Sequence, residues 1–165
     1  MVKSLDSYQI SEDSKNILNM APQLLEAVVG IFAQANVPLP QRQYWMTGRP
    51  AEDCEQVVVS LLQVYLGTPG DQATTPRQCS DPRSAVYNIS ITREVPVSQQ
   101  NGNPPTPASL QAASEWAAVD AWLLIDNLKS FDSAFSGKGI IATVLVDDPQ
   151  GGVQSTNLNL TVVIP

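Results

Sequence analysis

The sequence predicts an α+β fold: a mainly antiparallel β-sheet with two principal helices packed on one of its faces. Two observations predict this class. Segments with apolar residues at three- and four-residue steps are interspersed with segments in which apolar and polar residues alternate. Their order is helix, strands, helix, β-hairpin, without the repeated strand–helix alternation of a parallel sheet. At 165 residues the chain fits one domain, residues 1–165, and its polar start, residues 1–12, is expected to be flexible.

The first helix is expected from about Glu12 to Ala35. Pro22 lies inside this stretch and either kinks the helix or marks its true start. The proline-containing segment 36–40 then ends it. One apolar stripe runs along the helix and consists of Ile17, Ala21, Leu24 or Leu25, Val28, Phe32 and Ala35.

Three strands are expected in the middle of the chain. Gln43–Thr47 is short. The near-continuous apolar run Gln56–Leu66 has a β-branched start, which favours a strand covered on both faces, although its leucine-rich second half leaves a helix open. Alternation over residues 85–95 predicts an amphipathic strand with Arg93 on its otherwise apolar row. Long loops rich in turn formers, at 67–83 and 97–107, separate these elements.

The second helix has a clear start, because Thr106 is a suitable N-cap and Pro107 suits the first helical position. We expect it to end within 130–138 and to carry a core stripe of Leu110, Ala113, Ala117, Ala121, Leu124, Leu128 and Phe131.

Three further apolar residues of this helix, Trp116, Trp122 and Ile125, widen its apolar surface beyond one face. We favour flanking core for them; the alternative is a contact with another subunit, since exposed aromatic patches often mark interfaces. The acidic residues Glu115, Asp120 and Asp126 are expected on the solvated side of the helix.

Two final strands, 139–146 and 153–165, form a predicted hairpin joined by 147–152. In the last strand Leu158, Leu160, Val162 and Ile164 alternate with Asn157, Asn159, Thr161 and Val163. This period of two predicts one buried face and one mostly polar face. Asp147 and Asp148 are interpreted as an ordinary acidic turn rather than a metal site.

Composition excludes several functions. The net charge of −7 and the scatter of nine basic residues argue against nucleic acid as a direct ligand. Because the chain has no histidine, the usual general base and the Ser–His and Cys–His arrangements are absent. It also lacks a glycine-rich phosphate loop with its lysine. We therefore expect no enzymatic activity, no cofactor and no metal site.

The two cysteines, Cys54 and Cys79, are expected to be isolated thiols, with a disulfide between them as the alternative. The acidic residues beside Cys54 disfavour its thiolate and so disfavour a catalytic thiol. No apolar run reaches the roughly 18–20 residues that span a bilayer, and Met1–Ser4 lacks the apolar stretch of a secretion signal. These features predict a soluble protein made in the cytoplasm, with no membrane partner.

Four stretches carry a resemblance to a known family: AVVGIFAQANVPLP (27–40), RPAEDCEQVVVSLLQVY (49–65), PRSAVYNISITREVP (82–96) and QAASEWAAVDAW (111–122). With the closing strand pair, they resemble tail terminator proteins of long-tailed bacteriophages, of the type found in phages of actinobacteria. The similarity covers nearly the whole chain beyond its first dozen residues. The element order is also similar to that of the lambda-type terminator.

The resemblance implies a mechanical role. Terminators form a ring, a hexamer by this resemblance, on the head-proximal end of the tail tube of the virion, after assembly in the host cytoplasm. The ring stops addition of major tail protein and offers a docking face to the head connector. DNA passes through its lumen without specific binding, where an acidic wall would not grip it.

From the exposure pattern we expect contact surfaces in the loops 68–83 and 97–106 and on the polar face of residues 87–94. The individual candidates for subunit or tube contacts are Asp71, Arg77, Arg83, Asn88, Ser90, Thr92, Glu94, Gln99 and Asn101. Three other functions stay open: a head-closure or connector ring at the same junction, a small-molecule-binding regulatory α+β domain, and a thiol-dependent enzyme.

Overall fold

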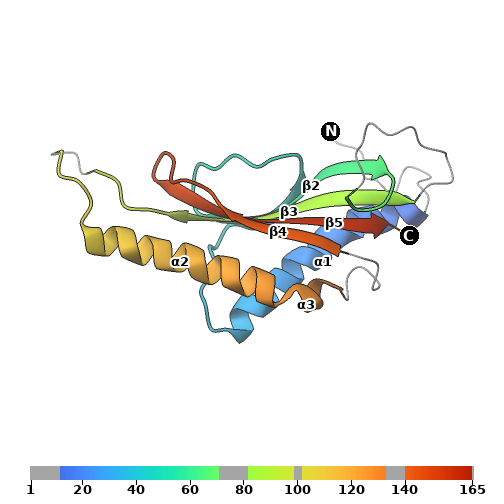
Figure 1. Ribbon diagram of the computed structural model, residues 1–165, viewed down its shortest axis with the longest axis horizontal. Coiled ribbons are helices and arrows are strands. Elements are labelled where there is room, and N and C mark those ends of the chain that lie inside the picture. The colour runs from blue at the N-terminus through green and yellow to red at the C-terminus, as the bar shows by residue number, and fades with distance from the viewer. Residues whose placement is uncertain (1–11, 71–81, 99–101, 133–139, 165) are drawn as a thin grey trace.

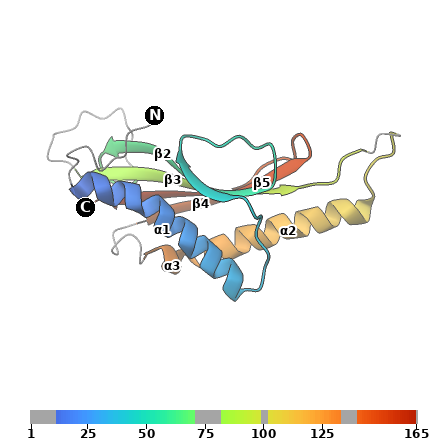
Figure 2. The ribbon, with the colours of Figure 1, turned by 180° about the vertical axis from the view of Figure 1, so that it is seen from behind.

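The computed structural model describes residues 12–70, 82–98, 102–132 and 140–164. Two long helices lie on one face of a five-stranded sheet with the strand order β1-β2-β3-β5-β4 (Figures 1 and 2). Neighbouring strands are antiparallel, apart from β1 and β2, which are parallel. The predicted α+β class, with a mainly antiparallel sheet and helices on one face, is confirmed. Most of the predicted flexible start, residues 1–11, lies outside the described residues.

Helix α1 (Glu12–Gln34) is continuous through Pro22, so this proline does not mark its start. Most of the predicted stripe is confirmed, since Ala21, Leu24, Val28 and Phe32 are buried, whereas Ala35 follows the last helical residue and is exposed. Two residues after the end of the helix, Asn36 adopts the left-handed conformation with φ of 55°. The amide of Val37 then donates to the carbonyl oxygen of Phe32 at 3.0 Å, as in a helix C-cap of the Schellman type.

The sheet is built from β1 (Gln43–Thr47), β2 (Gln56–Leu66), β3 (Arg83–Glu94), β4 (Ile140–Val146) and β5 (Val153–Ile164). The run 56–66 is a strand over its whole length, so the helical alternative for its second half is wrong. Coverage on both faces holds only for Gln56–Ser60, since the strand is irregular after Leu61 and its last residues are largely exposed.

The core lies between the sheet and the helices. On this face the sheet buries the side chains of Val57, Val59, Ala85, Tyr87, Ile89, Ile91, Leu158, Leu160 and Val162. The hydroxyl of Tyr87 donates to the carbonyl oxygen of Ile17 at 3.0 Å, which ties β3 to α1. Burial raises the pKa of the Tyr87 phenol, so this group stays a neutral donor.

The opposite face of the sheet is also covered, at β2 and β3, by the connection 48–55 between β1 and β2 (Figure 1). Gln56 anchors this connection and is fully buried. Its side-chain amide donates to the carbonyl oxygen of Ala51, and its Oε1 accepts from the Tyr44 hydroxyl at 3.0 Å. The polar side chain of Gln56 therefore holds the connection 48–55 against this face of the sheet through hydrogen bonds within the chain.

Helix α2 (Pro107–Asp126) begins as predicted, with the Ser109 amide donating to Thr106 Oγ1 at 3.2 Å. It ends at Asp126, and a short helix α3 (Leu128–Asp132) follows, so the predicted single helix is divided. Leu124 and Phe131 are buried as expected, whereas Leu110 is 46 % exposed and is not part of the core.

The C-terminal hairpin is confirmed. Its turn is tighter than the six-residue link read from the sequence, because Gln150 and Val153 exchange backbone hydrogen bonds at 2.9 and 3.0 Å. Gly151 and Gly152 between them have φ values of 59° and 87°, which a type I′ turn requires and which glycine adopts at no steric cost. The predicted alternation in β5 also holds, with Leu158, Leu160, Val162 and Ile164 buried.

Candidate interaction surface

Helix α2 is apolar on almost every side. Ala117 and Leu124 are buried against the sheet, while Trp122 on the other side is 65 % exposed. Val119 and Ile125 are exposed as well, at 38 % and 37 %. A helix that is apolar all round is normally enclosed, and here only one side is covered. The favoured interpretation of Trp122 as flanking core is therefore wrong.

A second apolar surface lies on β4, at the end of the sheet. The strand IIATVLV has no charged residue and no proline, the two features that commonly protect an edge strand. Its register with β5 puts Ile141 and Leu145 opposite Thr161 and Asn157, on the face without helices. Both side chains are exposed, at 46 % and 51 %.

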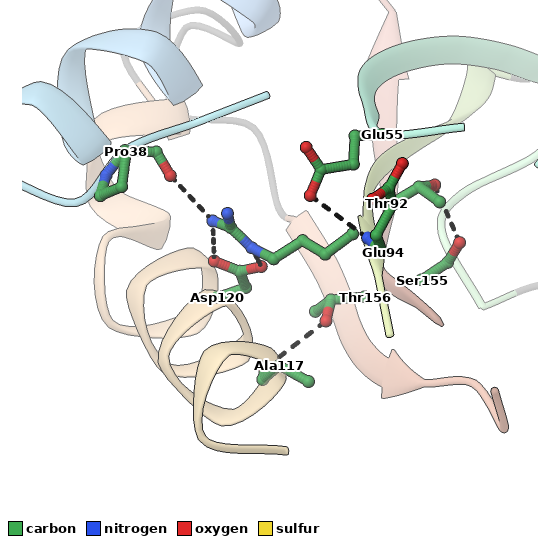
Figure 3. Close-up of polar contacts among 9 residues, drawn as sticks. Pro38, Glu55, Thr92, Glu94, Ala117, Asp120, Ser155 and Thr156 are labelled. Atoms are coloured by element: carbon green, nitrogen blue, oxygen red, sulfur yellow. Dashed lines mark hydrogen bonds and ion pairs between the residues drawn. The ribbon is translucent and has the colours of Figure 1, made fainter. Parts of the chain in front are cut away.

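Helix α2 is fixed to the sheet by a buried ion pair between Arg93 of β3 and Asp120 (Figure 3). Arg93 Nε donates to Oδ2 at 2.6 Å and Nη2 donates to Oδ1 at 2.8 Å, a two-bond geometry typical of strong arginine–carboxylate pairs. Nη2 also donates to the carbonyl oxygen of Pro38 at 3.0 Å, and the guanidinium lies 5.1 Å from the Trp116 ring centroid. One side chain thus joins β3, α2 and the segment after α1.

The environment of Asp120 opposes its ionisation. Its side chain is 1 % exposed, and burial raises the pKa of this carboxyl, while the hydrogen bonds and the charge of Arg93 lower it. The prediction that Asp120 lies on the solvated side of the helix is wrong. The spacing could have shown it, since Asp120 is three residues after Ala117 and four before Leu124, on the same stripe.

Trp116 is 43 % exposed, and the Arg93 guanidinium lies over its ring in a cation–π contact. A hollow of about 180 Å³ lies beside this pair, between Trp116, Glu94 and Gln154. It is smaller than the roughly 300–1,000 Å³ typical of pockets for small molecules. The geometry assigns Arg93 and Asp120 to holding α2 in place.

The polar row of β3 does not form an open contact surface. Ser90 and Thr92 are 1 % and 0 % exposed, so the expectation that they face outward is wrong. Thr92 Oγ1 lies 2.9 Å from Ser155 Oγ, a hydrogen bond between strands. The connection 48–55 and the cross-strand pairing, neither visible in the alternation of one strand, account for this burial.

Asn88 lies in the middle of the same row and is 8 % exposed. Its amide nitrogen donates to Asn157 Oδ1 at 3.2 Å and to Asn159 Oδ1 at 3.1 Å, and the amide of Asn157 donates to Asp147 Oδ2 at 2.6 Å. A hollow of about 190 Å³ opens above this network, between it, Leu145 and the connection 48–55. Asn88 therefore makes its hydrogen bonds with β5 within the sheet and is not an open contact residue.

The other candidate contact residues are distributed along the chain. Arg83 and Glu94 are exposed at the two ends of β3, and the backbone amide of Glu94 donates to Glu55 Oε1 at 3.2 Å. The structure does not bring these two residues together. Asp71, Arg77, Gln99 and Asn101 lie outside the described residues, so their contacts stay predictions.

Cys54 carries a free thiol and is half-buried. Its Sγ accepts from Arg42 Nη1 at 2.8 Å and lies 3.4 Å from Asp53 Oδ1. The free thiol of Cys54 agrees with the predicted isolated thiols, and Cys79, the other half of the alternative disulfide, lies outside the described residues. In the part of the chain that the structure describes, no three His, Cys, Asp or Glu side chains form a group able to hold a metal ion.

The stretch Asn16–Gln34 of α1 is long and apolar enough to span a membrane, judged by length and composition only. The sequence analysis did not expect such a segment. Core helices of soluble proteins also meet this criterion, and α1 packs its buried stripe, including Leu24 and Val28, against the sheet. Its exposed positions are mostly polar, among them Asn19, Gln23 and Glu26, as expected for a core helix with one solvated side.

No protein-family profile matches the chain, and no curated protein matches it in sequence. The chain is thus classed by its α+β fold and by the uncovered apolar surfaces of α2 and β4.

Proposed function

We propose that this chain is a structural virion protein: a tail terminator that forms a ring on the head-proximal end of the tail tube of a long-tailed bacteriophage. The family resemblance of four stretches, 27–40, 49–65, 82–96 and 111–122, suggests this role. Its partners are further copies of itself, the major tail protein and the head connector. No enzymatic step is part of the role.

The observation that carries the proposal is the apolar surface left uncovered on α2 and β4. Trp122 and Leu145 are 65 % and 51 % exposed, and each belongs to a larger apolar surface. Such surfaces mark sites of protein association in soluble proteins. A cyclic ring joins two different surfaces of each subunit, and α2 and β4 supply apolar area for such contacts.

The charge of the chain supports the same role. At a net charge of −7 the protein repels DNA at long range, which suits a ring through which DNA passes. The two hollows of about 180 and 190 Å³ are smaller than typical small-molecule pockets, which disfavours the regulatory-domain alternative.

The experiment is electron microscopy of particles produced when this gene is silenced during infection. Overlong or ragged tails detached from filled heads are expected, because growth of the tube would no longer be stopped. A copy of the gene supplied in trans should restore normal tail length, which controls for effects on neighbouring genes.

Tails of normal length beside emptied heads would contradict termination and indicate a head-closure ring instead. Normal virions would contradict both roles.

A further inference from the structure

The two end strands of the sheet, β1 and β4, run in opposite directions. β1 is parallel to β2, and each of the next three pairings, β2 with β3, β3 with β5 and β5 with β4, is antiparallel. Three reversals therefore separate β1 from β4. If two copies lie side by side in the same orientation, β4 of one meets β1 of the next as an antiparallel pair.

Both end strands are suited to such a pair. β4 has seven residues and β1 five, QYWMT, and neither contains a charge or a proline. Each has one neighbour among the described strands, so one row of its backbone hydrogen-bonding groups is available to another chain. On the face without helices, Ile141 and Leu145 of β4 would lie beside Tyr44 and Met46 of the next copy.

The helix layer would continue in the same way. Within one copy α2 packs against β4 and β5, and α1 packs against β1 and β2. Joining β4 to β1 of the next copy therefore brings α2 next to α1 of that copy. On α2, Trp122 and Val119 are exposed and would be covered there. The exposed positions of α1 are mostly polar, such as Gln23 and Glu26, so the apolar area at this helix contact comes from α2.

Charges at the ends of the two strands are complementary. Arg42 immediately precedes β1, and Asp147 and Asp148 immediately follow β4. In an antiparallel pair these ends coincide, so the guanidinium of one copy lies beside the two carboxylates of the other. Within one copy Arg42 lies 3.5 Å from Asp53, and the two side chains are 53 % and 68 % exposed. An exposed ion pair of this kind is weak, so Arg42 can also interact with the carboxylates of the next copy.

We propose that β4 of one copy pairs in antiparallel fashion with β1 of the next copy, which continues both the sheet and the helix layer across the subunit boundary. The inference deepens the ring-forming role and rests on it. The contact is heterologous, because each copy uses two different edges. Closure of the ring covers both edges of every copy and leaves no strand open to uncontrolled pairing.

Cross-linking of two complementary cysteine variants tests this pairing. Arg42→Cys and Asp148→Cys are made separately in a full-length chain that also carries Cys54→Ser and Cys79→Ser. A flexible bifunctional maleimide reagent is used, since it tolerates a shift in strand register. Arg42 and Asp148 are exposed and Cys54 is half-buried, so these substitutions should not prevent folding. Circular dichroism of each variant checks this.

An equimolar mixture is expected to give cross-linked dimers, whereas each variant alone gives none, because the pairing never places two copies of the same position together. Chains with both Arg42→Cys and Asp148→Cys should give a ladder of higher species. Gln63→Cys is the control, because it lies on the exposed part of β2 beyond the end of β1, six residues along the strand from the partner of Gln43, and it should give no dimer with either variant.

Absence of dimers in the mixture would overturn the proposal. Equal cross-linking in each variant alone would also overturn it, since it would indicate a symmetric contact. Overlong tails on gene silencing without cross-linking would leave the terminator role standing and remove this interface. Cross-linking together with normal virions on gene silencing would support this interface and remove the terminator role.

Discussion

Replacing Arg93 with methionine should destabilise the fold strongly, because it removes the only cation paired with Asp120 among the described residues. Methionine keeps much of the length and apolar character of the side chain. The carboxyl of Asp120, 1 % exposed, would lose both hydrogen bonds from the guanidinium. Removing one partner of a buried ion pair typically costs about 3–5 kcal/mol, and we expect a loss of that order in the free energy of unfolding at neutral pH.

The loss should depend on pH. Burial already raises the folded-state pKa of Asp120 above its ordinary value of 3.8, and Arg93 limits that rise. Without Arg93 the folded-state pKa rises further, so the folded protein holds the proton more tightly than the unfolded chain. The free energy of unfolding of Arg93→Met, relative to the original chain, should fall as the pH rises through the folded-state pKa of Asp120 in the original chain, which lies above 3.8, and should recover on acidification.

Urea unfolding followed by tryptophan fluorescence measures these values, at one fixed protein concentration because self-association would add to stability. Arg49→Met is the matched control: this arginine is exposed on the connection 48–55 and is not part of the proposed β4–β1 contact, so the same change should cost no more than about 0.5 kcal/mol. Arg93→Met combined with Asp120→Leu should regain most of the loss, since no unpaired charge remains. A loss for Arg93→Met no larger than for Arg49→Met, or one independent of pH, would refute the reasoning.

Three further predictions concern α2. Trp122→Ser should change the free energy of unfolding by no more than about 0.5 kcal/mol, because the side chain is 65 % exposed, yet reduce self-association in sedimentation; unchanged sedimentation would contradict its place in an interface. Leu124→Ala should cost about 2–5 kcal/mol in urea unfolding, because this side chain is fully buried; a cost near zero would mean that α2 does not pack as described. Thr106→Ala should cost about 1 kcal/mol by loss of the N-cap, which thermal unfolding would detect and Thr106→Ser should largely avoid.

Local patterns predicted the elements of this fold well, because they depend on near neighbours in sequence. The cap at Thr106 and the alternation in β5 are both present in the structure. The hairpin turn was also predictable, since two consecutive glycines allow the positive φ values that it needs.

The errors arose where a residue's environment is set by distant parts of the chain. Ser90 and Thr92 look solvent-facing within their strand, but the connection 48–55 and β5 cover them. Asp120 looks like a surface acid until Arg93 is known to face it across 27 positions of sequence.

The candidate interaction surface was harder to predict than the fold. Apolar spacing alone cannot tell whether Trp122 packs within the chain or against another copy, because both environments select the same residue type. The edge position of β4 depends on strand order, which a single sequence does not reveal. Once the order is known, its charge-free and proline-free sequence becomes informative.

Tail length in phage carrying charge-exchanged variants tests the central claim most directly. Arg42→Glu places a third carboxylate beside Asp147 and Asp148 at the proposed β4–β1 contact. Asp148→Lys places an ammonium group beside Arg42, and a chain with both changes again pairs an acid with a base at these two positions. We predict overlong tails with either single change and normal tails with both, measured by electron microscopy. Normal tails with each single change, or overlong tails in all three variants, would contradict a terminator ring assembled through these edges.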